Sequence, residues 1–363
     1  MNIIVLATAT RTSGALSIYR QFISHLPHYT SGHQFYLFID PTMDHPKISG
    51  VNYIMKETHS WWDRIWWDRK GVKLWMTNNH IIPDVIVSLQ NTGIITDCKQ
   101  VIYYHQSIPF YPKKWNPFKA SERIMFLYKY IYPWFVSSTL NKKTDVVVQI
   151  PFIKRCFVEK FKIDQARVHV FFPDIKKNNI DQVIPARLDF NLYHFIYPAV
   201  AESYKGHCVL VEAIAELKQR DPVLAAKIRI HLTITPNDYP SLYTIICAKK
   251  VEGQFVWQGR MEYTTLLSFY KAVQGLLFPS TIETLGLPLI EAASFGLPIL
   301  VSDACYSHEV IGDYLGGHFL SPDDHKQWSY AIEELCNFPF SYPALQIKES
   351  SWPLFFDLIF DHH

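Results

Sequence analysis

The sequence has few cysteines, and their arrangement suggests neither a cross-link nor a metal site. Six cysteines occur in 363 residues, and none belongs to a Cys-x-x-Cys pair. This scatter makes a disulfide framework or a zinc site unexpected and is typical of a reduced cytosolic protein. The cysteines are Cys98, Cys156, Cys208, Cys247, Cys305 and Cys336.

Excess charge and long apolar runs are missing as well. The chain has 35 Lys and Arg against 33 Asp and Glu, and a net charge of +2 argues against nucleic acid as the main partner. No stretch reaches the length of a membrane span without a charge or a proline. The N-terminus, MNIIVLATAT, lacks the basic region of a signal peptide. We therefore expect a cytoplasmic protein.

Apolar residues are plentiful: hydrophobic residues make up 48% of the chain and aromatic residues 15%. A chain of this length suits two domains rather than one core. Short apolar runs alternate with helical patterns, which predicts an α/β fold. We expect a first domain at 1–180, a second at 181–345 and a terminal helix at 346–363. Periodicity is lost and charge gained at 175–190, where we place the linker.

The N-terminal pattern resembles the opening of a Rossmann-like domain. A predicted strand at 3–7 leads into a loop of small residues that ends at Gly14, and a helix follows at 15–26. The loop has no G-x-G-x-x-G, so dinucleotide binding is not supported. Gly14 lets the backbone approach a ligand closely, although a simple tight turn explains it equally well.

Polar side chains follow two further predicted strands, at 84–89 and 101–104. Ligands of parallel sheets bind at the carboxyl ends of the strands. Four residues are therefore candidates for a ligand site: Asn91, Thr92, His105 and Gln106.

Two stretches combine aromatic and basic residues. The first, at 60–76, contains WWDR twice, five residues apart, and predicts a helix with Trp62, Ile65, Trp66 and Leu74 packed inward. The alternative is a surface at a membrane interface, where Trp with Lys and Arg is favoured.

The second aromatic-basic stretch, at 113–143, predicts a core helix at 124–132. The lysines flanking this helix suggest peripheral contact with an anionic membrane. These lysines are Lys113, Lys114, Lys119, Lys142 and Lys143.

The most informative segment is PSTIETLGLPLIEA, at 279–292. It follows a predicted strand, and Gly286 with Pro288 shapes the start of a helix, where backbone N–H groups and the helix dipole favour anions. Glu283 lies in the turn and Glu291 eight residues later in the helix. The two carboxylates either accept hydrogen bonds from sugar hydroxyls or serve only as a helix cap and a solvated residue.

The longer string FPSTIETLGLPLIEAASFGLPILVSD resembles the donor-site motif of the family 4 glycosyltransferases, which are retaining enzymes of GT-B fold. The resemblance implies two Rossmann-like domains whose parallel sheets face each other across a cleft. It also implies a C-terminal helix that crosses back to the first domain. The apolar segment SWPLFFDLIF at 351–360 suits that helix, because it needs a surface to bury against.

The resemblance also implies roles for individual residues. Lys205 would offset the charge of the nucleotide diphosphate, Glu283 would contact the transferred sugar, and His105 would approach that sugar from the first domain. These three are the predicted catalytic residues. The predicted donor-binding residues are Lys205, Glu283, Thr284, Gly286, Leu287, Glu291 and Arg260. The predicted acceptor-side residues are Gly14, Asn91, Thr92 and Gln106.

One departure concerns phosphate binding. Many members of the family carry an Arg shortly before the lysine, but this chain has Ala199 and Val200 there. The Tyr-Pro-Ala opening and the sequence Lys205, Gly206, His207 resemble a subset of the family instead. A second phosphate-binding cation is therefore not identified.

The function implied by the resemblance is transfer of a hexose or deoxyhexose from a nucleotide-diphosphate sugar to a glycan or lipid-linked glycan. Bacterial O-antigen or capsule synthesis would be its setting. We expect no metal or other cofactor, because the lysine and the helix dipole offset the phosphate charge and no Asp-x-Asp pair occurs. The alternatives are an inactive sugar-nucleotide-binding scaffold and another GT-B enzyme, either a phosphorylase or an inverting transferase.

Overall fold

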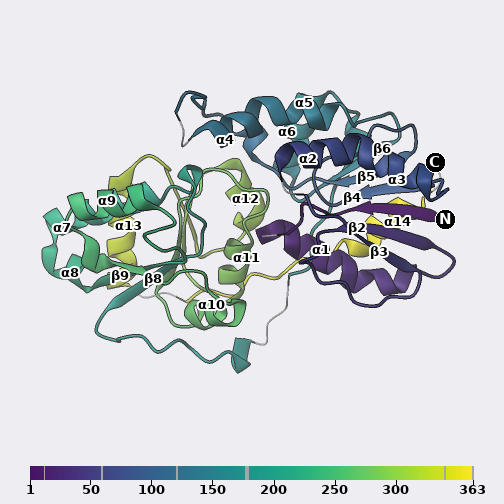
Figure 1. Cartoon of the computed structure of the whole chain (residues 1–363). Helices are drawn as coiled ribbons and strands as arrows, with labels where there is room; N and C mark the ends of the chain where they lie inside the picture. The colour runs from purple at the N-terminus through teal and green to yellow at the C-terminus, as the bar shows by residue number, and fades with distance from the viewer. Residues whose placement is uncertain (12, 59, 120–121, 176–179, 339–340, 362–363) are drawn as a thin grey trace. The chain divides into compact units, whose positions relative to one another are not determined.

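A computed structural model describes residues 1–363 except 12, 59, 120–121, 176–179, 339–340 and 362–363 (Figure 1). The chain forms two compact units. The first unit comprises residues 1–174 and 348–363, and the second comprises residues 175–347.

The first unit is built on a seven-stranded parallel sheet with the order β3-β2-β1-β4-β5-β6-β7. The order reverses between β1 and β4. Strand β1 pairs in parallel with both β2 and β4, and Ile3 lies opposite Phe35 on one side and Val85 on the other. Such a reversal is where ligands bind in open parallel sheets. The strands are β1 (Asn2–Leu6), β2 (Gln34–Ile39), β3 (Val51–Met55), β4 (Val85–Ser88), β5 (Lys99–Tyr103), β6 (Thr144–Val148) and β7 (Val168–Val170).

Helices cover both faces of this sheet. Alternate residues of β1 pack against α1 and α14 on one face, and against η2 and α3 on the other. The helical segments are α1 (Ser13–His25), η1 (Leu26–Tyr29), α2 (Trp61–Trp66), η2 (Trp67–Gly71), α3 (Val72–Asn78), η3 (Ile108–Phe110), α4 (Arg123–Phe126), η5 (Leu127–Ile131), α5 (Tyr132–Ser137), α6 (Pro151–Phe161), η6 (Gln165–Arg167) and α14 (Trp352–Phe360).

The terminal helix α14, yellow in Figure 1, packs into the core of the first unit, as predicted. The ring of Phe356 stacks on Phe22 at 5.3 Å and on Tyr29 at 4.1 Å between centroids. The indole N–H of Trp352 donates to Gln21 at 2.9 Å. The apolar tail thus finds the surface that its composition requires.

The inward packing predicted for the first aromatic-basic stretch is wrong. Trp62, Trp66 and Leu74 are 70%, 50% and 52% exposed, whereas Trp67 is buried. Trp62 and Trp66 lie in α2, before the π-helical turn η2, whereas Leu74 lies after it. The extra residue of that turn shifts the inward face only for the residues that follow.

The predicted core helix at 124–132 is also largely exposed. Ile124, Leu127 and Tyr130 face solvent, and only Met125 and Tyr132 of this stretch are buried. A second π-helical turn, η5, interrupts the α-helical period here. Both aromatic-basic stretches therefore present rings on the surface.

The second unit contains a six-stranded parallel sheet with the order β10-β9-β8-β11-β12-β13. Its order reverses between β8 and β11. The strands are β8 (Tyr193–Tyr197), β9 (Ile228–Leu232), β10 (Phe255–Trp257), β11 (Gly275–Phe278), β12 (Ile299–Ser302) and β13 (Gly317–Leu320).

Helices flank this sheet as well, and α13 buries Trp328, Ile332 and Leu335 as its periodicity predicts. The helical segments are η7 (Ile180–Gln182), η8 (Ser203–Lys205), α7 (His207–Arg220), α8 (Pro222–Lys227), α9 (Pro240–Ala248), η9 (Glu252–Gln254), α10 (Tyr263–Tyr270), α11 (Leu287–Ser294), α12 (Cys305–Ile311) and α13 (His325–Asn337). The predicted α/β class with two parallel sheets is confirmed.

Candidate active site

Two loops meet at the strand-order reversal of the second unit. One follows β8 and carries Lys205, and the other follows β11 and carries Glu283. Thr281 joins them, since its backbone N–H and its hydroxyl donate to the Tyr204 carbonyl at 2.8 and 2.9 Å. Gly206 makes the close approach feasible: its φ is +71°, and a Cβ there would lie 2.3 Å from the carbonyl oxygen of Pro279.

Lys205 and Glu283 form an ion pair in which Nζ lies 2.5 Å from Oε1. The same carboxylate oxygen accepts from the Ser280 hydroxyl at 2.6 Å. The two charged side chains are only 12% and 14% exposed, so each depends on the other for its charge partner. The pair places a cation and a carboxylate together at the carboxyl ends of β8 and β11.

Two buried tyrosines hold the loops that carry this pair. The Tyr197 hydroxyl donates to the carbonyl of Lys205, and the Tyr306 hydroxyl donates to the carbonyl of Ser280 at 2.7 Å. Burial raises the pKa of both hydroxyls well above the ordinary value, so they remain protonated donors. The two tyrosines therefore hold the backbone of both loops that carry the ion pair.

The helix after the second loop, α11, begins without a side-chain cap. Gly286 is its N-cap residue with φ +71°, and Pro288 occupies its first turn. Leu287 lies between them and is half-buried, as is Thr284 in the preceding turn. An uncapped helix start presents backbone N–H groups and the positive end of the dipole, a combination suited to phosphate.

Glu291 lies one turn further along α11 and accepts from the Tyr270 hydroxyl at 3.3 Å. Burial raises the pKa of Glu291 to about 7, against the opposing hydrogen bond from Tyr270. A buried carboxyl of this kind gains from further hydroxyl donors, which stabilise its ionised form.

Among the described residues, neither Arg260 nor Ala199 and Val200 hydrogen-bond to the ion pair. Arg260 is exposed and follows Gly259, whose φ is +66°. At the position where the resemblance implies an arginine, Val200 is about half-exposed and the Ala199 N–H donates to Thr233.

In the first unit, Asn91 and His105 are in contact. The side-chain oxygen of Asn91 accepts from the backbone N–H of His105 at 2.6 Å, and Asn91 has φ +71°. Nε2 of His105 lies 3.1 Å from the Leu89 carbonyl, which requires the proton on Nε2. Burial lowers the pKa of His105, and the charge of Arg64 acts in the same direction, so this ring is neutral at pH 7.

The other predicted acceptor-side residues are more scattered. The Gln106 side chain accepts from the N–H of Ile108 at 3.1 Å, and the Thr92 hydroxyl faces Asp68. Gly14, predicted in a loop, lies exposed in the first turn of α1, because that helix begins at Ser13.

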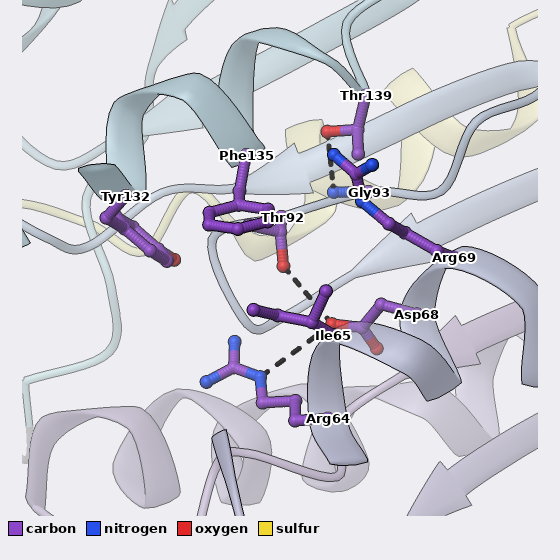
Figure 2. A pocket seen from close by; sticks show the side chains of 9 residues that line it. All are labelled: Arg64, Ile65, Asp68, Arg69, Thr92, Gly93, Tyr132, Phe135 and Thr139. Atoms are coloured by element: carbon purple, nitrogen blue, oxygen red, sulfur yellow. Dashed lines mark hydrogen bonds and ion pairs between the residues drawn. The ribbon is translucent and has the colours of Figure 1, made fainter. Parts of the chain in front are cut away.

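A pocket of about 30 Å³ lies beside Thr92 in the first unit (Figure 2). Asp68 lines it and accepts from Gln90 at 2.9 Å, while Nε of Arg64 lies 3.7 Å away. Burial raises the pKa of Asp68 to about 6, opposed by the charge of Arg64. Figure 2 shows Arg69, Tyr132 and Phe135 around the same space.

Sequence reasoning missed the side chains that support these positions. Ser280 lies inside the motif, but Tyr306 and Tyr270 act across 26 and 21 residues of sequence. Asp68 was visible only as part of the WWDR repeat.

The described residues contain neither a metal-ligand cluster nor a membrane-spanning helix. Within those ranges, no three His, Cys, Asp or Glu side chains are grouped as ligands of a metal. Nor is any helix placed by the structure long and apolar enough to span a membrane.

Comparison with known proteins gives one family match, "Glycosyl transferases group 1", over residues 181–346. The chain is 21% identical over 268 residues to the O-antigen chain mannosyltransferase RfbU of Salmonella typhimurium, covering 74% of this chain and 66% of that protein. It is 22% identical over 176 residues to the D-inositol 3-phosphate glycosyltransferase of Pseudarthrobacter chlorophenolicus, covering 46% and 41%. The chain thus matches less than two thirds of the length of either relative.

Among solved structures, the glycosyltransferase WaaG, involved in lipopolysaccharide biosynthesis, has a TM-score of 0.68 at 13% identity, covering 93% of this chain and 91% of that one. Sucrose-phosphate synthase from Thermosynechococcus elongatus has a TM-score of 0.66 at 14% identity, covering 93% and 90%. Anabaena HepE, solved with UDP and glucose, has a TM-score of 0.59 at 14% identity, covering 93% and 90%. At these identities the structures show the fold, and the family match covers most of the second unit. Residues 181–346 therefore match the group 1 glycosyltransferase family, and the chain has the GT-B fold of these solved structures.

Proposed function

We propose that the protein is a retaining glycosyltransferase that moves a hexose or deoxyhexose from a nucleotide-diphosphate sugar to a glycan or lipid-linked glycan. The observation that carries the proposal is the ion pair of Lys205 and Glu283, held at the strand-order reversal of the second unit. That place binds ligands in sheets of this kind, and the pair supplies both a cation and a hydroxyl acceptor.

The diphosphate of the donor would lie between Lys205 and the start of α11. The lysine offsets phosphate charge, and the backbone N–H groups near Gly286 and Leu287 donate to phosphate oxygens. When the sugar leaves, negative charge grows on the diphosphate, and these fixed donors stabilise it without rearranging. Since this scheme needs no metal, we expect transfer to proceed in the presence of a chelator.

The two glutamates would hold hydroxyl groups of the donor. Glu283 would accept from the transferred sugar and Glu291 from the ribose. Ser280 already orients the first carboxylate and Tyr270 the second. Thr284 and Arg260 would contribute donor contacts around this frame.

The first unit would bind the acceptor. Asn91, Thr92 and Gln106 follow its strands, and Gly14 lies at the start of α1. His105, neutral and fixed by the Leu89 carbonyl, would contact the sugar through its position rather than through a charge.

The setting we propose is O-antigen or capsule synthesis at the cytoplasmic face of a membrane. Support comes from the relative named as an O-antigen mannosyltransferase and from the exposed rings of Trp62, Trp66 and Trp134. Tryptophan beside lysine and arginine favours the headgroup region of an anionic bilayer.

The test is turnover of Lys205→Ala and Glu283→Ala with a panel of nucleotide sugars that includes GDP-mannose and UDP-glucose. Both variants should lose transfer, whereas Glu212→Ala, which removes an exposed ion pair with Lys249, should keep it. Unchanged turnover in both site variants would refute the assignment. Binding of nucleotide without transfer would favour the scaffold, and an inverted anomer in the product would favour an inverting enzyme.

A further inference from the structure

Residues of the WWDR repeat line a pocket that is not part of the proposed donor site. The first copy of the repeat supplies Arg64 and the second supplies Asp68 and Arg69, and all three line the pocket of the first unit (Figure 2). The opposite wall comes from Tyr132 and Phe135 of α5.

The charges in this pocket do not balance. Asp68 is its one lining carboxylate, and it is held by Gln90 at 2.9 Å and paired with Arg64 at 3.7 Å. Arg69 has no carboxylate partner in the part of the chain that the structure describes. Its guanidinium instead donates to the Ser138 hydroxyl at 2.9 Å and lies over the ring of Trp134 at 4.9 Å.

Two guanidinium groups against one carboxylate leave a positive excess in a partly buried site. Arginine presents several N–H donors in a planar fork, which matches the oxygens of phosphate. The hydroxyls of Thr92 and Thr139 also line the space, but they already donate to Asp68 and to the Val136 carbonyl, so the arginines are the donors left for an anion. A volume of about 30 Å³ is room for about two or three water-sized atoms, which suits two oxygens of one phosphate group and excludes a nucleotide.

The residues around the pocket indicate which kind of molecule bears the anionic group. Thr92 is a predicted acceptor-side residue, and the charge of Arg64 reaches His105. Trp62 and Trp66 flank the arginines in sequence, and they are exposed together with Trp134. An anion bound here would therefore have exposed aromatic rings on the neighbouring segments.

We propose that this pocket is a subsite for the phosphate group of the acceptor, with Arg64 and Arg69 as its ligands and a lipid as the group's carrier. The proposal rests on the proposed function, because it assigns the acceptor as a phosphate-linked lipid. It adds a second anion site, separate from the one at Lys205.

Pyrophosphate titration by calorimetry tests the subsite. Because pyrophosphate also fits the donor site, the titration uses Lys205→Met protein, in which that site is weakened. Residual binding is expected, and it should weaken roughly tenfold or more when Arg64→Gln or Arg69→Gln is added. Arg20→Gln, which removes an exposed ion pair with Asp44, is the matched control and should change nothing.

Two further arms identify the carrier and guard against misfolding. Phosphatidylcholine vesicles containing phosphatidic acid should retain the Lys205→Met protein, and the arginine variants should release it, whereas glucose 6-phosphate should bind weakly. Stronger binding of glucose 6-phosphate than of the phosphatidic acid vesicles would refute a lipid as the carrier of the phosphate. Arg69→Lys keeps the charge but loses the fork, so intermediate affinity is expected if the variant folds.

The decisive negative result is pyrophosphate binding that Arg64→Gln and Arg69→Gln leave unchanged, or no binding at all in Lys205→Met protein. Either result would refute the subsite. Nucleoside diphosphate binding by the wild-type protein, measured in parallel, reports on the donor site separately. If the wild-type protein does not bind nucleoside diphosphate, the proposed function is refuted instead.

Discussion

Replacing Glu283 by glutamine should strengthen the binding of free nucleoside diphosphate while it abolishes sugar transfer. The carboxylate of Glu283 lies 2.5 Å from Nζ of Lys205, so it competes with phosphate for this cation. It also repels the diphosphate directly. Glutamine removes the charge but keeps a side-chain oxygen for Ser280.

The size of the effect follows from the geometry. At 2.5 Å and an effective dielectric constant of about 20, Coulomb's law gives ~7 kcal/mol for the ion pair. Desolvation of both groups offsets most of this energy, because they are only 12% and 14% exposed. Each ~1.4 kcal/mol of net pair energy that is released on binding corresponds to a tenfold increase in affinity, and we expect a gain of this order.

The assay is calorimetric titration with UDP and GDP of the wild type, Glu283→Gln, Lys205→Met and the control Glu212→Gln. We expect tighter binding in the first variant, weaker binding in the second and no change in the control. Equal or weaker binding by Glu283→Gln, with Lys205→Met still weakened, would refute the competition between carboxylate and phosphate.

Three further predictions concern stability, and each is read by thermal or denaturant unfolding. Gly206→Ala should destabilise the protein by more than about 2 kcal/mol, because it adds a Cβ 2.3 Å from a carbonyl oxygen at positive φ, whereas Gly253→Ala has open space and should be nearly neutral. His207 is buried with both ring nitrogens unpaired among the described residues, and burial lowers its pKa to about 3. Between pH 6.5 and 3 His207 is protonated in the unfolded state but not in the folded state, so the free energy of unfolding falls as the pH falls through that window. His207→Phe should remove on the order of 4 kcal/mol of this loss. Phe356→Ala should cost about 3–5 kcal/mol, while Leu354→Ala, at an exposed position of the same helix, should cost under about 0.5 kcal/mol; equal costs would contradict the docking of α14.

Local patterns predicted the parallel strands well. The predicted strands at 3–7, 84–89 and 101–104 correspond, within two residues at each end, to β1, β4 and β5 of the first sheet. The terminal helix was predictable because so apolar a segment requires burial.

The partners of the site residues were not predictable. The Lys205 ion pair joins positions 78 residues apart, and the Tyr306 hydrogen bond joins positions 26 apart. Neither leaves a periodic signal, because both depend on which strands become neighbours. The inward position predicted for Leu74 failed for a different reason: Leu74 follows a π turn, and the α-helical period does not hold through such a turn.

At the start of that π turn, the WWDR stretch has one tryptophan on the surface and the next in the core. Trp66 and Trp67 are adjacent in sequence, yet one is half-exposed and the other packs on Phe38 of the sheet at 5.4 Å between centroids. One helical segment is thereby packed into the core through Trp67 and exposes the indole of Trp66 to solvent. Because Trp67 and Val72 are both buried five residues apart, deleting one residue within 68–71 would place them four apart in an α-helix and should leave Trp67 inward and Trp66 outward.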